Sequence, residues 1–263
     1  MTIHVLIQCT KSKLISPENG LIWDKASSIT DWAEKWDKAV PKLPVKDMYT
    51  GRFFQENISF INDAKDCTFW VVSAGSGLIQ SDQMIPAYEA TFRQGMGPTP
   101  SEWHLLPSGG LENISIDKGD TIVCFLSPKY EQAIIEDPSF EELKHAFVVR
   151  ENSRIANKSS DHLIKIHPRS REVLKVASVD LNSALTKLYL EHGHEGMENL
   201  FSECEKLEPK PKRRRVNARE LEGILSDLPK EFSLQQVVRH LRDEMLISAS
   251  YERIRDILAH LRN

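Results

Sequence analysis

Two carboxylates and a tyrosine lie close together in one short stretch, at Asp82, Tyr88 and Glu89. Cleavage of an N-glycosidic bond requires such groups, because a carboxylate stabilises the positive charge that develops on the sugar and orients a water molecule. A flipped base requires an aromatic face and hydrogen bonds to its edge, which Tyr88 with Gln80 or Gln83 would provide. Spacing alone favours a simpler interpretation, a solvated carboxylate pair beside a packing tyrosine, so the surroundings of this stretch decide between the two.

Polar motifs follow three apolar runs that have the composition of buried strands. The lysines and hydroxyls of Cys9–Lys13 suit an anion such as a DNA phosphate. The glycine loop Ser73–Leu78 can expose backbone amides as an anion nest, and Ser127–Tyr130 has the N-cap and first-turn proline of a helix. Ordinary capping explains each motif singly, but three on one sheet edge predict a site there. We therefore expect phosphate contacts from Lys11, Ser12, Lys13, Ser127 and Lys129, and base contacts from Ser73 and Gly75.

Two further motifs offer weaker phosphate-binding candidates. Thr50 and Arg52 open a predicted helix, where Thr50 as a simple N-cap is the more common role and phosphate binding the alternative. His167 and Arg169 follow a weak strand-like run, where a histidine can contact a phosphate or polarise a base carbonyl. A lone surface histidine is more common, so this motif stays a secondary prediction.

The sequence predicts neither a metal ion nor a cofactor. His192 and His194 lie two residues apart at a predicted helix end, which favours a capping turn around Gly193 over a zinc site. The four cysteines are widely spaced and form no CxxC pair, which is typical of reduced thiols in the cytoplasm. No run approaches the roughly 18 apolar residues of a membrane span, and we recognise no signal peptide. We expect a cytoplasmic protein without a membrane partner.

Strand-like and helical patterns alternate along the first part of the chain. Helical spacing occurs at Trp32, Trp36 and Val40 and again from Phe53 to Ile61, while residues 93–113 are rich in glycine and proline and predict a long surface excursion. This alternation predicts an α/β fold with a mostly parallel central sheet flanked by helices. The strand-like runs are residues 2–8, 68–74 and 121–126, with weaker ones at 147–150 and 162–166.

Charge divides the chain into two parts. Residues 209–263 hold 12 Lys and Arg against 8 Asp and Glu, a net charge of +4, whereas residues 1–208 hold 22 and 30, a net charge of −8. Two prolines and four consecutive cations predict a basic linker at 209–216. It is either a solvated hinge or a phosphate-contacting arm, in which Arg213, Arg214 and Arg215 would lie beside DNA.

The last part of the chain, 217–263, has purely helical apolar spacing. Three short helices with a positive net charge resemble a helix-turn-helix or winged-helix module, with Arg253 on the last helix facing DNA. A small helical cap that only dimerises or packs on the core is the alternative. The predicted organisation is thus an α/β catalytic domain at 1–208, the linker at 209–216 and a helical DNA-binding domain at 217–263.

Four motifs, taken in order, resemble a bacterial and phage domain family: IQCTKSK, DMYTGRFF, VVSAGSGLI and PAYEATF. The family pattern is Cys-x-Lys-x-Lys, Tyr-Thr-Gly, Ser-Ala-Lys-x-Gly-Leu and Pro-x-Tyr with an acidic residue, and the resemblance covers about residues 3–130. The sequence departs from it at Gly75-Ser76, where the family has a lysine and an aromatic residue. The role of that lysine would then fall to Lys11, Lys13 or Lys129.

This family is similar to the peroxide-stress YaaA-like proteins and to the core of archaeosine synthases, which implies a uracil-DNA-glycosylase-like α/β fold. The run from His167 to Ser170 is partly similar to the His-Pro-Ser-Pro loop of uracil-DNA glycosylases. Some members of this neighbourhood are phage-defence DNA glycosylases that excise glucosylated hydroxymethylcytosine. An α/β core followed by a helical DNA-binding tail looks like that kind of protein.

The resemblance therefore implies a DNA glycosylase that removes a modified base from double-stranded phage DNA and leaves abasic sites. Glu89 or Asp82 would stabilise the sugar cation, and Lys11, Lys13 and Lys129 would hold phosphates, or one of them would attack the sugar through a Schiff base. One alternative is a non-catalytic DNA-binding sensor or regulator. Another is a tRNA- or nucleotide-modifying transferase of the archaeosine-synthase type, and a YaaA-like stress protein is a weaker third.

Overall fold

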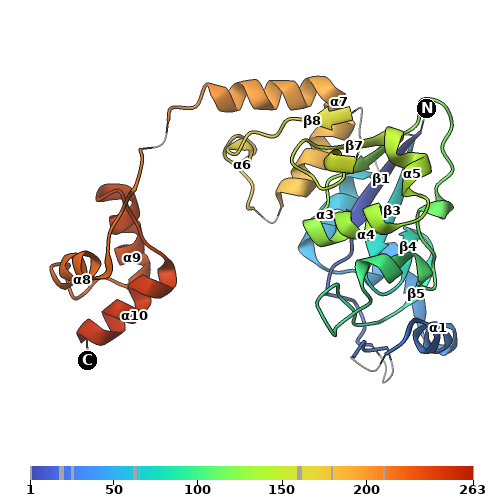
Figure 1. Cartoon of the computed structure of the whole chain (residues 1–263), viewed down its shortest axis with the longest axis horizontal. Coiled ribbons are helices and arrows are strands. Elements are labelled where there is room, and N and C mark those ends of the chain that lie inside the picture. The colour runs from blue at the N-terminus through green and yellow to red at the C-terminus, as the bar shows by residue number, and fades with distance from the viewer. Residues whose placement is uncertain are drawn as a thin grey trace. The chain divides into compact units, whose positions relative to one another are not determined.

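The structure is a computed structural model that describes residues 2–17, 21–24, 27–61, 64, 66–158, 162–178, 180–209 and 211–262. It divides into two compact units, Met1–Lys206 and Leu207–Asn263, and each unit has a hydrophobic core of its own (Figure 1). None of the helices in the described ranges combines the length and the hydropathy required to cross a bilayer.

The first unit is built on a six-stranded sheet with the strand order β4-β3-β1-β6-β7-β8. Five strands are parallel, and the edge strand β4 runs antiparallel to β3. The five predicted strand runs all form strands, which confirms the α/β fold with a mostly parallel sheet. The strands are β1 (Ile3–Gln8), β3 (Cys67–Ser73), β4 (Gly77–Gln80), β6 (Thr121–Cys124), β7 (Phe147–Arg150) and β8 (His162–Ile164).

The central strand β1 is buried on both faces of the sheet. Val5, Leu6 and Ile7 are all buried, as a continuous apolar run requires when helices cover both sides. The parallel pairing with β3 continues past the strand end, where the amide of Cys9 donates to the carbonyl of Val72 at 3.0 Å. The residues after β1 are therefore held at the carboxyl edge of the sheet.

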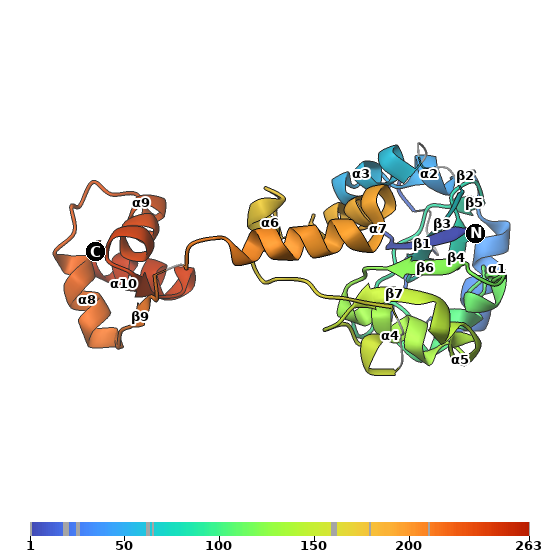
Figure 2. The same ribbon diagram turned by 90° about the horizontal axis from the view of Figure 1, so that it is seen from above.

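Helices cover both faces of the sheet. Figure 2 shows α3 and the first part of α7 on one face and α4 with α5 on the other. A small antiparallel pair of strands, β2 (Lys42–Pro44) and β5 (Met84–Pro86), lies outside the main sheet. The helices of this unit are α1 (Ile29–Lys38), α2 (Val45–Met48), α3 (Arg52–Ile61), α4 (Pro128–Glu136), α5 (Phe140–Leu143), α6 (Ser170–Val173) and α7 (Leu181–Glu205).

Helix α1 follows its predicted apolar stripe over two of three residues. Trp32 and Trp36 are buried, and the side chain of Ser28 caps the helix by accepting from the amide of Asp31. The helix ends at Lys38, so Val40 lies outside it and is 65% exposed. The prediction that Val40 continues the apolar face of this helix was wrong, because the spacing of apolar residues does not show where a helix ends.

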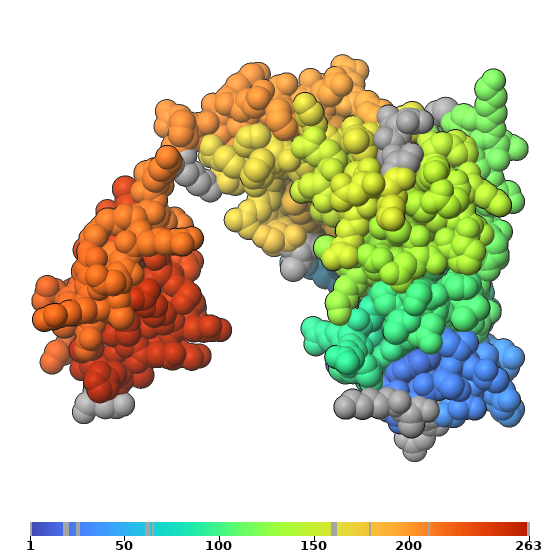
Figure 3. Space-filling view, viewed as in Figure 1, coloured from blue at the N-terminus to red at the C-terminus, as the bar shows by residue number. Residues whose placement is uncertain are grey.

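The segment 93–113 is not only a surface excursion. It contains two short 3₁₀ helices, Pro100–Leu105 and Leu111–Asn113, and Trp103 and Leu111 are fully buried. The indole of Trp103 donates to the carbonyl of Ser73 at 2.9 Å. In the space-filling view the segment around residue 100 lies against the segment that contains α1 (Figure 3). The glycines and prolines of this segment form tight turns between buried residues. Their number in the sequence does not show that such buried residues lie between them.

The strand order makes the carboxyl end of β1 a topological switch point. The chain leaves β1 to form β3 on one side of it and later returns to form β6 on the other side. The connections therefore diverge at β1, and open α/β sheets bind ligands in the crevice that this divergence leaves. Residues Cys9–Lys13 follow β1 at this place.

The second unit is a small helical bundle with one short strand pair. Its helices are α8 (Ala218–Ser226), α9 (Leu234–Arg239) and α10 (Tyr251–Arg262), and a π-helical turn, His240–Glu244, follows α9. The predicted capping box of Ser233 and Gln236 is present.

The basic stretch 209–216 is not a linker over its whole length. Arg214–Arg215 form β9, which pairs in parallel with β10 (Ile247–Ser248), and Val216 is buried in the core of the second unit. The amide of Arg214 donates to the carbonyl of Leu246 at 2.8 Å. The expected linker is therefore corrected at its end: Val216 is anchored in the core and Arg214–Arg215 form a strand, although both arginines stay exposed.

Candidate functional site

Segments that are distant in the sequence are joined around the residues that follow β1. The amide of Thr50 donates to the carbonyl of Ser12 at 3.1 Å, and an antiparallel bridge joins Lys13 to Tyr49. Glu89 is fixed by a parallel bridge to Ile22, with backbone hydrogen bonds of 2.8 Å on either side of it. Backbone hydrogen bonds therefore fix the positions of both Lys13 and Glu89.

Gly51 allows two of these segments to approach closely. A Cβ atom at this position would lie 2.7 Å from the hydroxyl oxygen of Thr10, closer than such atoms pack. The Tyr-Thr-Gly motif is therefore explained by packing: the tyrosine enters the core, and the glycine leaves room for the segment after β1.

A chain of buried hydroxyls lies beneath the site. The hydroxyl of Tyr88 is 2.5 Å from that of Tyr49 and 2.5 Å from that of Ser73. The oxygen of Ser73 also accepts from the amides of Gly75 at 3.2 Å and Ser76 at 2.9 Å. Burial raises the pKa of both Tyr49 and Tyr88, so both phenols stay neutral and rigid.

These contacts correct the predicted base-binding roles of Ser73, Gly75 and Tyr88. Ser73 and Tyr88 are buried and their hydroxyls are satisfied within the protein. The amides of Gly75 and Ser76 point at Ser73, so they form no anion nest for a ligand. The three residues support the floor of the site because their polar groups bind one another.

The Gly75→Ala substitution is expected to destabilise the protein by about 1–3 kcal/mol, the usual cost of overpacking. A Cβ atom there would lie 2.5 Å from the ring of Tyr88, which is buried and cannot move aside. Urea unfolding of the variant and the wild type measures the difference. If the stability were unchanged and ligand binding were weakened, Gly75 would instead belong to the ligand-binding surface.

A cavity of about 190 Å³ lies above this floor, and its walls come from the segments after β1, after β5 and at the start of α4. Among the described residues that line it, Glu89 is the only acid, beside the three cations Lys11, Lys13 and Arg93. Lys11 forms an ion pair of 3.1 Å with Glu89 and its side chain is 84% exposed. The lining residues are Cys9, Thr10, Lys11, Lys13, Glu89, Ala90, Thr91, Arg93, Met96 and Tyr130.

Lys13 is the more enclosed of the two lysines. Its ammonium lies 4.1 Å from the centre of the Tyr88 ring and 5.5 Å from that of Tyr49. Burial is the main cause that lowers the pKa of Lys13, and the charge of Lys11 acts in the same direction. Cys9 and Glu89 oppose this effect. Lys13 is therefore easier to deprotonate than a lysine in water.

Tyr130 closes one side of the cavity and was not among the predicted site residues. Its hydroxyl is 3.3 Å from the sulfur of Cys9, and its ring packs edge-on against Phe92. The predicted phosphate ligand Lys129 donates to the carbonyl of Phe92 at 2.9 Å, so it braces this wall. The sequence pattern that could have identified Tyr130 as a site residue was its position in the first turn of the predicted helix after β6. Arg93 had no such signal.

The structure does not bring Gln80, Asp82 and Gln83 to the cavity. Strand β4 runs antiparallel to β3, and its last residue, Gln80, pairs with Trp70 in the middle of β3. The following turn therefore lies away from the carboxyl edge, and the side chain of Gln83 donates to Ser108 at 3.1 Å. The expected carboxylate pair of Asp82 and Glu89 does not form. The antiparallel strand β4 carries the chain away from the carboxyl edge, and Asp82 lies in the turn that follows this strand.

The weaker phosphate candidates are engaged elsewhere. Arg52 pairs with Asp180 at 2.5 Å, and Arg169 pairs with Glu172 at 3.0 Å. His167 accepts from the amide of Arg169 at 3.1 Å. None of these three residues lines the cavity described above. Thr50 does not line it either, and its backbone amide donates to Ser12.

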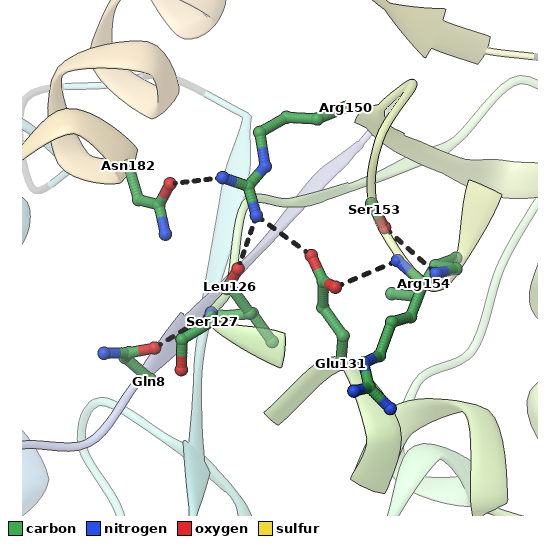
Figure 4. A network of polar contacts seen from close by, with 9 residues as sticks. Gln8, Leu126, Ser127, Glu131, Arg150, Ser153, Arg154 and Asn182 are labelled. Atoms are coloured by element: carbon green, nitrogen blue, oxygen red, sulfur yellow. Dashed lines mark hydrogen bonds and ion pairs between the residues drawn. The ribbon is translucent and has the colours of Figure 1, made fainter. Parts of the chain in front are cut away.

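A buried ion pair fixes the neighbouring strand ends (Figure 4). Arg150 at the end of β7 binds Glu131 of α4 at 3.1 Å, the carbonyl of Leu126 at 2.8 Å and Asn182 of α7 at 3.1 Å. The amide of Ser127 donates to the side chain of Gln8 at 3.1 Å. Ser127 does not line the cavity, and its backbone amide joins the end of β6 to β1. Helix α4, which carries Tyr130, is held against β1 and β7.

The arginines of the second unit are only partly free of internal contacts. Arg213 binds the carbonyl of Arg242 at 2.8 Å and pairs with Asp243 at 3.1 Å, and Arg214 pairs with Glu220. Arg253 donates to the carbonyl of Val216 at 3.3 Å. Arg215 is exposed.

The predicted turn between two histidines is present. Gly193 has φ of 59° and interrupts the helical backbone of α7 between His192 and His194. In the described parts of the chain no group of three His, Cys, Asp or Glu residues is placed to hold a metal ion.

Residues 35–160 match a family described as a family of unknown function (DUF6884). This match contains Tyr49, Tyr88, Glu89 and Tyr130 but begins after Cys9–Lys13. No curated protein and no solved structure matches the chain.

Proposed function

We propose that the protein is a DNA glycosylase that hydrolyses the N-glycosidic bond of a modified base in double-stranded DNA. Glucosylated hydroxymethylcytosine of phage DNA is the proposed base, and antiphage defence the proposed purpose. The motif resemblance supports this proposal, and with it a uracil-DNA-glycosylase-like form of the α/β fold.

The observation that carries the proposal is one carboxylate among three cations in a small cavity at the switch point. Glu89 would stabilise the positive charge on the sugar as the base leaves and orient the attacking water. Lys11 and Arg93 would hold the phosphates on either side of the flipped nucleotide. A bound phosphate would compete with Glu89 for Lys11 and so release the carboxylate from its ion pair.

The size of the cavity fits this chemistry. Pockets for drug-sized ligands enclose roughly 300–1,000 Å³, whereas this one encloses about 190 Å³. It suits a single ring, the sugar or the base, with the rest of the substrate outside. It is too small for a whole dinucleotide cofactor.

The second unit would supply affinity for the duplex. The net charge of +4 over residues 209–263 contrasts with the −8 of the remainder, and phosphate neutralisation makes such binding depend on salt. The exposed Lys212 and Arg215 would contact phosphates. Sequence-independent anchoring of this kind is what an enzyme that searches a duplex requires.

Replacing Lys212 and Arg215 together by alanine is expected to weaken binding to duplexes of any sequence. The slope of log K against log salt concentration should fall in magnitude by about 2, one for each lost phosphate contact. Fluorescence anisotropy over a salt series measures it, with Lys118→Ala, an exposed lysine of the first unit, as the control. An unchanged slope would remove these two residues from the DNA interface.

The decisive test of the proposal is incubation of the full chain with T4-type glucosylated DNA and with unmodified DNA. Alkali-induced strand breaks score abasic sites, and mass spectrometry identifies the released base. Breaks and free glucosylated base from modified DNA alone are expected. Binding without release would favour the DNA-binding sensor, and a preference for structured RNA would favour the nucleotide-modifying transferase.

A further inference from the structure

We propose that Lys13 is the nucleophile of this site and that its amine forms a covalent Schiff base with the sugar from which the base is removed. This inference rests on the proposed glycosylase function and goes beyond it, since a hydrolase needs only water at this step. It predicts that the protein also cuts the DNA strand at the abasic site.

The placement of Lys13 carries the inference. Its backbone is fixed by the bridge to Tyr49, and the amide of the next residue, Leu14, donates to Met48 at 2.8 Å. The amine lies over the ring of Tyr88, which the buried hydroxyl chain holds in place. It lines the same cavity as Glu89, so the amine and the carboxylate would face one sugar bound there.

The charges around the amine of Lys13 shift its pKa in opposite directions. Lys11 and Arg93 line the cavity beside it and disfavour a third positive charge, while Glu89 and the face of Tyr88 favour the ammonium form. Burial is the largest cause and lowers the pKa of Lys13; Cys9 opposes it together with Glu89, and the pKa is lowered overall. A larger fraction of neutral amine is therefore present near neutral pH than for a lysine in water.

The other two lysines of this region are less suited to attack. Lys11 is 84% exposed on its side chain and is paired with Glu89. Lys129 donates to the carbonyl of Phe92 and does not line the cavity. The ion pair with Glu89 engages the amine of Lys11, and the hydrogen bond holds that of Lys129 on the wall.

The chemistry balances without any further reactant except water. The neutral amine of Lys13 bonds to C1′ as the bond from C1′ to the base breaks, and the base leaves with the electron pair and takes up one amine proton through Glu89. The C1′–O4′ bond then opens, the second amine proton passes to O4′, and a C=N bond forms. Glu89, a carboxylate again once the base has taken its proton, accepts a proton from C2′. The C2′–H electron pair forms a C2′–C3′ double bond, and the 3′ phosphate leaves with the electron pair of the C3′–O bond, which breaks the strand. Water finally hydrolyses the C=N bond, which returns Lys13 as an amine and leaves an aldehyde.

Borohydride trapping tests the inference, because it reduces the C=N bond and links the protein to DNA permanently. The full chain is mixed with T4-type glucosylated DNA, with and without sodium borohydride, and base release is measured in parallel. A slow-migrating protein–DNA band is expected, and peptide mass spectrometry should place the adduct on Lys13. This mapping uses the wild type, so it does not depend on a variant that folds.

Variants sharpen the test. Lys13→Met keeps an aliphatic chain over Tyr88 and is expected to lose the trapped band, whereas Lys118→Ala should trap like the wild type. The rate of trapping should rise with pH through a pKa below that of ordinary lysine, because only the neutral amine attacks. Base release without a trapped band, or an adduct on another residue, would overturn the role of Lys13 and leave the glycosylase standing. Absence of base release from both DNAs would overturn the glycosylase itself.

Discussion

Glu89→Gln is expected to slow release of the modified base by about 10²–10³-fold, the usual effect of removing one group that stabilises charge in a transition state. The amide cannot carry the negative charge that the sugar cation requires, but it has nearly the same shape as the carboxylate. Single-turnover release of base from T4-type glucosylated DNA measures the rate. Binding of the DNA should change much less than the rate.

The structure lets this prediction be separated from an effect on folding. The ion pair of Glu89 with Lys11 is exposed, and such pairs contribute roughly 0–1 kcal/mol to stability. The contacts that position Glu89 run through its backbone, which the substitution leaves in place. The melting temperature of Glu89→Gln should therefore stay close to that of the wild type.

Asp82→Asn is the matched control. Asp82 is an exposed carboxylate on the turn after β4 and does not line the cavity. It should keep the full rate of base release. A loss of activity on Asp82→Asn with full activity on Glu89→Gln would overturn the choice of carboxylate, and full activity of both would remove carboxylate catalysis from the proposal.

Arg150→Met is expected to lower the free energy of unfolding by about 3–5 kcal/mol, the cost of removing one partner of a buried ion pair. Glu131 is only 2% exposed on its side chain and Arg150 is 18% exposed, so the remaining carboxylate would stay buried without its counter-charge. The amide of Arg154, at 3.0 Å, would still donate a hydrogen bond to that carboxylate. Urea unfolding followed by fluorescence measures the change.

Two comparisons test the cause of this loss. Combining Arg150→Met with Glu131→Gln should recover part of the stability, because the unpaired charge is then removed as well. Lys144→Met breaks the exposed pair with Glu141 in the same unit and should cost less than about 1 kcal/mol. Equal losses for Arg150→Met and Lys144→Met would show that the network in Figure 4 does not stabilise the fold.

Short-range patterns predicted most of the elements correctly. The buried strands are apolar runs, and Ser233 with Gln236 forms its capping box as the spacing indicates. Such features depend on neighbours a few residues apart, which the sequence displays directly. The edge strand β4 was missed because its four residues follow a glycine loop and lack alternation.

The candidate site was predicted only in part, for a physical reason. The motif after β1 and the residue Glu89 do meet at the cavity, where backbone hydrogen bonds to Leu21 and Trp23 hold Glu89. Asp82 does not meet them, because the antiparallel course of β4 carries it away from the carboxyl edge. Tyr88 was expected to face a base but turns inward, since its hydroxyl bonds to Tyr49 and Ser73.

The sequence by itself determined the α/β class, the alternation of strands and helices, and the concentration of positive charge near the end of the chain. Each of these follows from periodicity or composition, which need no knowledge of distant contacts. Only the tertiary structure decided which polar residues face the cavity and which form hydrogen bonds within the protein. Ser73 and Lys129 have the same donors and acceptors in either role. Their partners lie far along the chain, and folding alone brings them within reach.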